Sequence, residues 1–471
     1  MNAAAPLDGL VVLEVSSFVA APLGGLTLAQ LGADVIRIDP VGGGPDLGRW
    51  PLAPSGTSLY WTGLNKGKRS VTLNFRDAKG RSLLRDLLAA SGPGGGIVLT
   101  NAGQDWLGHA ELARVRPDLI HLQIQGYRDG RTAVDYTVNA ETGFPLITGP
   151  EDVAGPVNHV LPAWDVACGL YAAVGLLAAE RRRQRTGAGS AIALALADVA
   201  LAVAGHLGFL AEAQVTGTER RRIGNYLYGG LGRDFRTADG ERVMVVVLTR
   251  RHLADLGAAT GLAGTFGELE RLLGADFGQD GDRYRHREVL TALLEPWFAG
   301  RTLAEVERGL AGTSVLWSRY RRIIDLATDG TLAGNPLLAE IDQPGVGPLL
   351  APGSPLAMDG ATGPRPAPAL GADTGAVLIG LLGLSAEDVQ ALAERGIIGG
   401  PAPGTAALCG TANRRRGQRP DAERRPGRSR GLMRRKTDAS LDRNRRADRP
   451  AARHSGGGPR VRRSRDHPGG R

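Results

Sequence analysis

Short apolar runs alternate with helical patterns over the first third of the chain. Apolar residues continue for about the length of one strand at 10–15, 34–38, 70–73, 96–100 and 119–124. Patterns typical of helices lie between these runs, at 22–31, 78–90 and 105–115. The first helix has Pro22 at its start and Gly32 just past its end, which is the usual asymmetry of helix termini. Repeated strand–helix–strand units predict a Rossmann-like open parallel sheet covered by helices.

The remaining body of the chain is predicted as a long helix followed by a smaller unit. An Ala- and Leu-rich helix is expected over 166–183, and the next elements are a strand at 191–196, a helix at 198–214 and a crossing loop at 220–232. The smaller unit combines one strand with several helices, at 243–248, 251–260, 287–298 and 303–310. Two further helices, at 374–382 and 386–395, close the body. The fold class is therefore α/β, with a large domain and a smaller α+β domain.

The positive charge of the protein is concentrated at one end. The formal net charge of +9 would by itself suggest a nucleic-acid partner. However, residues 401–471 hold 21 Lys and Arg against 6 Asp and Glu, so residues 1–400 have a net charge of −6. This tail is rich in Arg, Gly and Pro, and we predict it to be disordered. It has no aromatic residue to stack on bases, so nucleic acid is not the expected partner, although an anion-binding arm remains an alternative.

Composition also limits the compartment and the class of enzyme. No apolar stretch approaches the ~20 residues that a membrane span needs, and the first residues do not form a signal peptide. Cys168 and Cys409 lie far apart, which fits a reducing cytoplasm and gives no disulfide framework or zinc site. The chain has no Gly-x-Ser-x-Gly elbow and no His-x-x-x-His pair, so hydrolase and metalloenzyme readings lack support and no metal is expected.

Three segments carry candidate chemistry. The small residues of the turn 16–22 would let a ligand approach the backbone at the carboxyl end of a strand. The basic cluster 65–69, which includes Lys68, is either a phosphate site or a solvated turn. Asp165 lies between Pro162 and an apolar helix, where it is either an N-cap or a carboxylate nucleophile.

Several stretches of the sequence, taken in order, resemble class III (family III) CoA-transferases. The stretches are 7–14, 31–39, 65–70, 98–101, 182–189, 224–240, 368–371 and 383–385. The resemblance covers about residues 5–400 and departs from the family at Ala372 and Asp373, where the family usually shows Glu and His. It implies a homodimer with interlocked subunits. It also implies a large CoA-binding domain built from 1–223 and 331–400, the latter including a linker, with the small domain at 224–330 between them.

The same resemblance assigns roles to individual residues. Asp165 falls on the catalytic aspartate of the family, Lys68 and Asn101 fall near the CoA moiety, and Phe18 and Val19 fall on the turn that faces the thioester. The family also contains α-methylacyl-CoA racemases, which use a His–Asp pair. Where their His is placed this chain has Val134, followed by Asp135, and valine accepts no proton, which argues against racemisation.

The implied reaction moves CoA between carboxylates through an aspartyl-CoA thioester on Asp165. The likeness favours transfer between two carboxyls of one small dicarboxylic acid. Intermolecular transfer between two acids and a non-catalytic acyl-CoA binding protein are the alternatives. CoA enters with the acyl-CoA substrate, so no cofactor is expected. Arg49, His159 and Arg233 are candidates for holding the idle carboxylate, and the loop 229–232 is the candidate lid.

Overall fold

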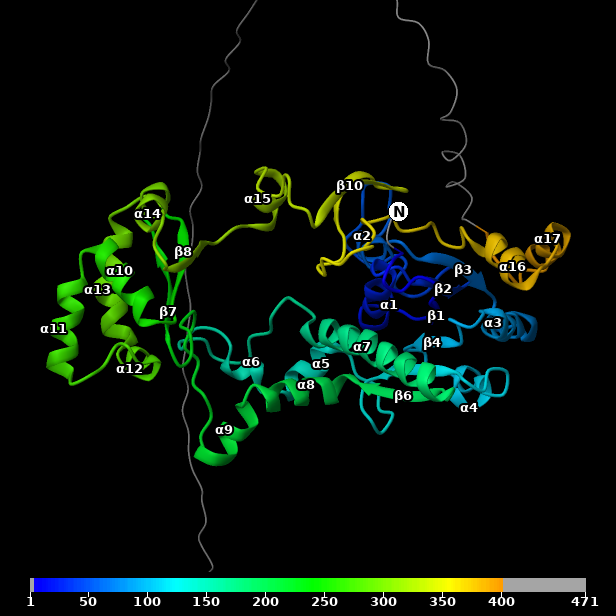
Figure 1. Cartoon of the computed structure of the whole chain (residues 1–471), viewed down its shortest axis with the longest axis horizontal. Coiled ribbons are helices and arrows are strands. Elements are labelled where there is room, and N and C mark those ends of the chain that lie inside the picture. The colour runs from blue at the N-terminus through cyan, green and yellow to red at the C-terminus, as the bar shows by residue number, and fades with distance from the viewer. Residues whose placement is uncertain (1–3, 401–471) are drawn as a thin grey trace, which may run out of the picture. The chain divides into compact units, whose positions relative to one another are not determined.

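The computed structural model describes residues 4–400 and contains a six-stranded parallel sheet (Figure 1). The predicted tail 401–471 lies outside the described residues. The strands are β1 (Val11–Val15), β2 (Asp34–Pro40), β3 (Arg69–Leu73), β4 (Ile97–Thr100), β5 (Ile120–Gln125) and β6 (Ser190–Ala195). Their order is β3-β2-β1-β4-β5-β6, which confirms the Rossmann-like open sheet. The strand order reverses between β1 and β4, and ligands of such sheets bind at this switch point.

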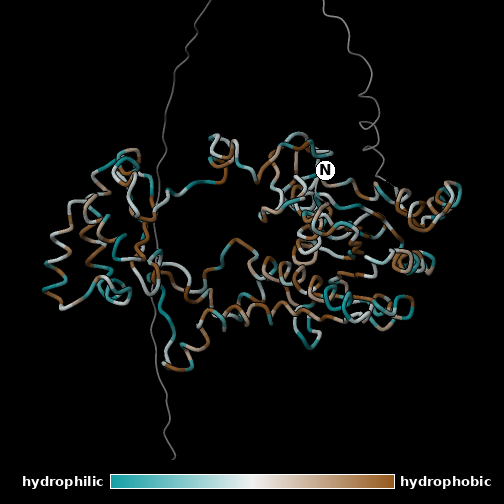
Figure 2. The backbone as a smooth tube through the Cα atoms, in the orientation of Figure 1, coloured by the Kyte–Doolittle hydropathy of each residue, from teal (hydrophilic) through white to brown (hydrophobic). Residues whose placement is uncertain are grey.

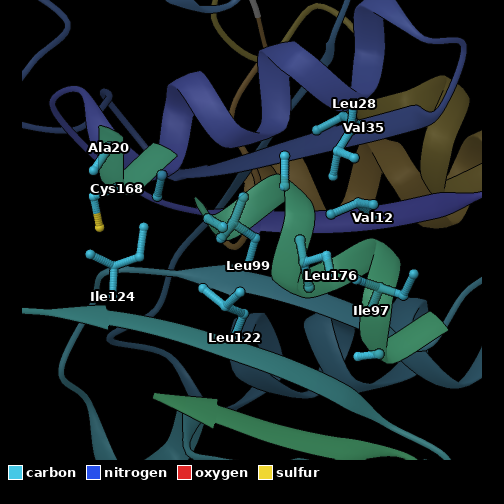
Figure 3. Close-up of a cluster of buried hydrophobic side chains, with 14 of the residues drawn as sticks. Val12, Ala20, Leu28, Val35, Ile97, Leu99, Leu122, Ile124, Cys168 and Leu176 are labelled. Carbon is cyan, nitrogen blue, oxygen red and sulfur yellow. The ribbon is translucent and has the colours of Figure 1, made fainter. Parts of the chain in front are cut away.

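Helices cover both faces of this sheet. The helices of this part of the chain are α1 (Ala20–Gln30), α2 (Leu59–Leu64), α3 (Ala78–Ala90), α4 (His109–Leu112), α5 (Asp135–Glu141), α6 (Phe144–Ile147), α7 (Ala163–Thr186), α8 (Leu196–His206), α9 (Phe209–Thr216), α16 (Thr374–Leu382) and α17 (Ala386–Glu394), of which α9 lies outside both cores of the sheet. Val12 and Leu99 point into the core beneath α1 and α7 (Figure 3). Leu13 and Val98 belong to the core on the opposite face. Successive strand residues alternate between the faces, so one strand supplies both cores.

Helices α1 and α7 approach each other unusually closely because glycines line their contact. A Cβ on Gly169 would lie 2.7 Å from the carbonyl oxygen of Ala20, and one on Gly24 would lie 3.1 Å from the carbonyl oxygen of Gly169. By length and composition α7 could cross a membrane, as could α8 and α9 if they were one straight helix, although they are bent by 61°. Cys168 and Leu176 of α7 are instead buried in the core, and Figure 2 shows α7 as a mainly apolar segment.

The last described residues pack on the edge strand of the parallel sheet. The side chain of Asp373 accepts a hydrogen bond from the amide of Ser70 (2.8 Å), and Thr374 accepts one from the amide of Thr72 (3.1 Å). Apolar side chains of α16 and α17 join the core that contains Leu13 and Val98. Residues about 300 positions apart in sequence therefore share one core, and β3 does not present a bare edge to solvent.

A second, antiparallel sheet has the order β7-β8-β9 and a core of its own, centred on Phe235 and Phe298. Its strands are β7 (Leu231–Arg236), β8 (Arg242–Val247) and β9 (Leu316–Arg319). The accompanying helices are α10 (Arg250–Thr260), α11 (Ala263–Leu273), α12 (Asp280–Arg285), α13 (Arg287–Ala299) and α14 (Leu303–Leu310). Helix α15 (Ile323–Thr328) and a hairpin of β10 (Leu338–Gln343) and β11 (Gly347–Pro352) follow.

Two predicted helices are broken in the structure. The helix expected over 105–115 is a short turn of 3-10 helix at Asp105–Leu107 followed by α4, with the extended Gly108 between them. The helix expected over 198–214 is divided into α8 and α9, because Gly208 adopts a left-handed conformation (φ 82°) that ends the first helix. Apolar periodicity alone does not reveal such interruptions.

Candidate active site

The two strands that flank the switch point are joined at their carboxyl ends. Asn101, which follows β4, accepts a hydrogen bond from the amide of Ser17 (3.0 Å) and donates one to the carbonyl oxygen of Ser17 (2.8 Å). The next residue, Phe18, has a left-handed backbone (φ 65°), and its amide donates to the carboxylate of Asp46 (3.1 Å). The side chain of Phe18 is 39% exposed, whereas Val19 is buried. Asn101 thus fixes the turn and Phe18 presents its ring outward from it.

Asp165 lies in the first turn of α7 but not at the N-cap, where the sequence placed it. The N-cap is Pro162, whose side chain accepts no hydrogen bond. The capping oxygen comes from Asp135 of α5, which accepts hydrogen bonds from the amides of Trp164 (2.8 Å) and Asp165 (3.1 Å). The carboxylate of Asp165 is therefore not engaged in capping its own helix.

The surroundings of Asp165 raise its pKa to about 6. Burial is the largest cause, the nearby charge of Asp135 adds to the rise, and the charge of Arg49 opposes it. Burial likewise raises the pKa of Tyr60 to about 12, where Arg49 opposes the shift and Asp165 adds to it. Asp165, Arg49 and Tyr60 therefore lie within electrostatic reach of one another.

The guanidinium of Arg49 lies against two aromatic rings. Its central carbon is 5.4 Å from the ring centre of Phe18 and 5.0 Å from that of Tyr60. No hydrogen bond or ion pair joins this guanidinium to another side chain within residues 4–400. Stacking without an anionic partner leaves its donors available to a ligand.

His159 lies beside Trp164, with the ring centres 6.4 Å apart. Its Nδ1 atom is buried without a hydrogen-bond partner in the described part of the chain. Trp164 is fixed on α5, because its indole nitrogen donates to Asn139 (3.0 Å). His206, in contrast, is exposed in the last turn of α8. His159 is thus the histidine that the structure brings near the start of α7.

Two of the expected site residues, Lys68 and Arg233, form hydrogen bonds to other residues of the protein. Lys68 is buried, and its amine donates to Glu14 (2.9 Å), to the carbonyl oxygen of Pro22 (2.8 Å) and to Asn65 (3.0 Å). All three of its protons are therefore used inside the protein. Arg233 lies on β7 and donates to the hydroxyl of Tyr226 (3.2 Å), with no ion pair to Asp165 among the residues that the structure describes.

The candidate lid, 229–232, is shorter than the sequence suggested. Leu231 and Gly232 belong to β7, and Leu231 is buried in the core of the small sheet. Only the turn before Leu231 is outside the strand. The expectation of a four-residue lid is wrong for that reason.

Residues that the sequence did not single out complete the site. Tyr60 and Asp46 contact Arg49 and Phe18 from distant segments, and no local motif marks them. Asp135, which the sequence offered only as the residue after Val134, binds the amide of Asp165. Across residues 4–400 no group of three or more His, Cys, Asp or Glu side chains is arranged to hold a metal ion. The arrangement is a half-buried carboxylate at a helix start, beside an unpaired cation, at the ligand-binding edge of an open sheet.

A family model described as CoA-transferase family III matches residues 7–374. The chain belongs to this family. It is 51% identical over 403 residues to the 2-methylfumaryl-CoA isomerase of Chloroflexus aurantiacus, covering 84% of this chain and 98% of that relative. The succinyl-CoA–D-citramalate CoA-transferase of the same organism is 28% identical, covering 83% and 98%. A crystal structure of a CAIB/BAIF family protein from Brucella suis has a TM-score of 0.67 and 25% identity, covering 80% of this chain and 100% of that chain.

Proposed function

We propose that this family III CoA-transferase is a 2-methylfumaryl-CoA isomerase. The observation that carries the proposal is the 51% identity to an enzyme of that name over nearly its whole length. The reaction would move CoA from the C1 to the C4 carboxyl of mesaconate and so form 3-methylfumaryl-CoA. The runner-up is intermolecular transfer between two acids, which the name of the 28% identical relative describes.

Asp165 is the proposed nucleophile, and each step exchanges one acyl bond for another. Its carboxylate attacks the thioester carbonyl, the C–S bond breaks, and a mixed anhydride and CoA thiolate form. The thiolate then attacks the aspartyl carbonyl and releases mesaconate, leaving an aspartyl-CoA thioester. The second carboxylate of mesaconate attacks that thioester, and the released thiolate attacks the new acyl carbonyl and frees Asp165. Splitting the exchange in this way gives only activated acyl intermediates.

The environment of Asp165 suits both halves of this cycle. A pKa of about 6 leaves most of the carboxylate ionised at neutral pH and makes it more basic than an ordinary carboxylate. A more basic group is a better nucleophile toward the thioester. Desolvation, which causes most of the shift, is also the condition under which the anhydride and the thioester escape hydrolysis.

Arg49 is the proposed partner of the idle carboxylate. Its guanidinium lies against Phe18 and Tyr60, and its charge acts on Asp165. A guanidinium binds a carboxylate through two parallel hydrogen bonds. His159 remains a second candidate because its Nδ1 atom is buried without a partner in the described chain. Arg233 has no comparable support.

We also propose a cytoplasmic homodimer. Large apolar side chains are exposed on α7, α8 and α9, among them Val174 (62% exposed), Leu201 (52%) and Val215 (86%). Surfaces of this kind are typical of interfaces between subunits.

The decisive experiment supplies 2-methylfumaryl-CoA alone, without a free acid, to the wild type and to Asp165→Ala. Liquid chromatography should show the C4 isomer only with the wild type. Mass spectrometry of quenched wild-type protein should show CoA attached to Asp165. Turnover that begins only after a second acid is added would show that the enzyme is an intermolecular CoA-transferase and not an isomerase. Binding without any turnover would leave an acyl-CoA binding protein.

A further inference from the structure

Two carboxylates meet at the start of α7, and they differ in what they contact. Asp135 is 2% exposed, and one of its oxygens accepts the amides of Trp164 and Asp165. Its other oxygen, Oδ1, is buried without a partner among residues 4–400. Asp165 accepts no such amide bond and is the more exposed of the two. The carboxylate of Asp135 therefore binds the backbone, whereas the carboxylate of Asp165 is available to react with the substrate.

The first amides of an α-helix have no acceptor within the helix. The N-cap residue of α7 is Pro162, and its side chain has no oxygen that could accept a hydrogen bond. Asp135 supplies the missing acceptor from a different helix, 30 positions before Asp165. The same helix α5 also binds the indole of Trp164 through Asn139. Both the backbone and the side chain next to the nucleophile are thus attached to α5.

We propose that Asp135 is the positioning residue of the active site, which fixes the first turn of α7 and thereby the direction of the Asp165 carboxylate. The proposal rests on the proposed role of Asp165. In the proposed reaction, Asp135 itself touches no reacting atom. Its burial beneath the helix start leaves Asp165 as the carboxylate that meets the thioester.

Asp135 also acts on Asp165 through its charge, apart from its hydrogen bonds to the helix start. It raises the pKa of Asp165 together with burial, while Arg49 lowers it. The other titratable groups facing Asp165 are Tyr60 of α2 and Cys168 on the next turn of α7, and the pKa of each is raised. Both are neutral when Asp165 ionises, so Asp135 and Arg49 are the charges that set its titration. An asparagine at 135 would retain an acceptor oxygen and remove the charge.

The experiment compares the rate of aspartyl-CoA formation across pH for the wild type, Asp135→Asn and Asp135→Ala. Asp8→Asn, which changes an exposed carboxylate outside the site, is the matched control. The asparagine variant should retain adduct formation within roughly tenfold at pH 8, with the midpoint of its acid limb moved to lower pH by about half a unit or more. The alanine variant should form the adduct on the order of tenfold more slowly than the asparagine variant, because it lacks the acceptor.

The outcomes separate this proposal from the proposed function. An unchanged acid midpoint in Asp135→Asn, or equal rates in the two variants, would overturn the positioning role. A wild type that forms no adduct would overturn the proposed function instead. Circular dichroism of each variant before the assay identifies misfolded protein, and the asparagine variant alone still tests the midpoint if the alanine variant does not fold.

Discussion

Asn101 holds Ser17 by two opposed hydrogen bonds, one from the Ser17 amide to the Asn101 oxygen and one from the Asn101 nitrogen to the Ser17 carbonyl. The pair ties the carboxyl ends of β1 and β4 together at the switch point of the sheet. Because the following residue, Phe18, has a left-handed backbone, its turn depends on this support.

The two bonds predict different results for two substitutions of Asn101. Asn101→Asp retains the acceptor but sets a carboxylate oxygen against the Ser17 carbonyl, whereas Asn101→Ala removes both bonds. We expect each variant to lose about 1–3 kcal/mol of unfolding free energy, and Asn101→Asp to have the lower kcat/KM. Urea unfolding and isomerase kinetics measure these effects. Wild-type stability in both variants would show that Asn101 does not support the turn.

The sequence predicts the large sheet well because its inner strands, such as β1 and β4, are short apolar runs buried on both faces. It also places Asp165 and Asn101 at element boundaries, and the structure has Asp165 in the first turn of α7 and Asn101 directly after β4. Their roles in the reaction stay predictions. It names Asp135 only as the residue after Val134 and does not reveal its contact with the start of α7, about 30 residues away. It does not reveal the internal contacts of Lys68 for a related reason, since the acceptor Glu14 lies 54 residues earlier on a buried strand.

Arg49 provides a test of how the second carboxylate is held. Arg49→Leu should raise KM for 2-methylfumaryl-CoA, and kcat/KM should fall on the order of 10–100-fold, as expected for the loss of a charge-assisted pair. A monocarboxylic acyl-CoA offered for adduct formation should be much less affected, because it has no second carboxylate. Tyr60→Phe, which keeps the ring under the guanidinium, is the control. Equal losses for the two substrates would assign Arg49 to another role.

Lys68 is expected to contribute to folding and not to CoA binding. Lys68→Met leaves Glu14 buried with Arg37 as its remaining cation, 3.8 Å away, and should cost about 3 kcal/mol of unfolding free energy. Lys66→Met is the matched control, because the Lys66 amine donates only to the carbonyl oxygen of Thr62 and is half-buried. Thermal unfolding and KM for acyl-CoA give the two readouts. A raised KM for acyl-CoA in Lys68→Met, together with wild-type stability, would show that Lys68 contributes to CoA binding.

The raised pKa of Asp165 predicts that catalysis is obtained at the expense of stability. A carboxyl group whose folded pKa lies above its unfolded value stabilises the fold at pH values below the unfolded value, near 4, and this contribution is lost as the pH rises through about 6. At pH 8 the ionised carboxylate should therefore destabilise the native state by on the order of 1–3 kcal/mol relative to a neutral isostere. Asp165→Asn should be more stable than the wild type at pH 8, and the difference should shrink toward pH 4. Urea unfolding at the two pH values measures it, with the exposed Asp8→Asn as the control, and a difference that is absent at pH 8 or grows toward pH 4 would contradict the assigned direction of the shift.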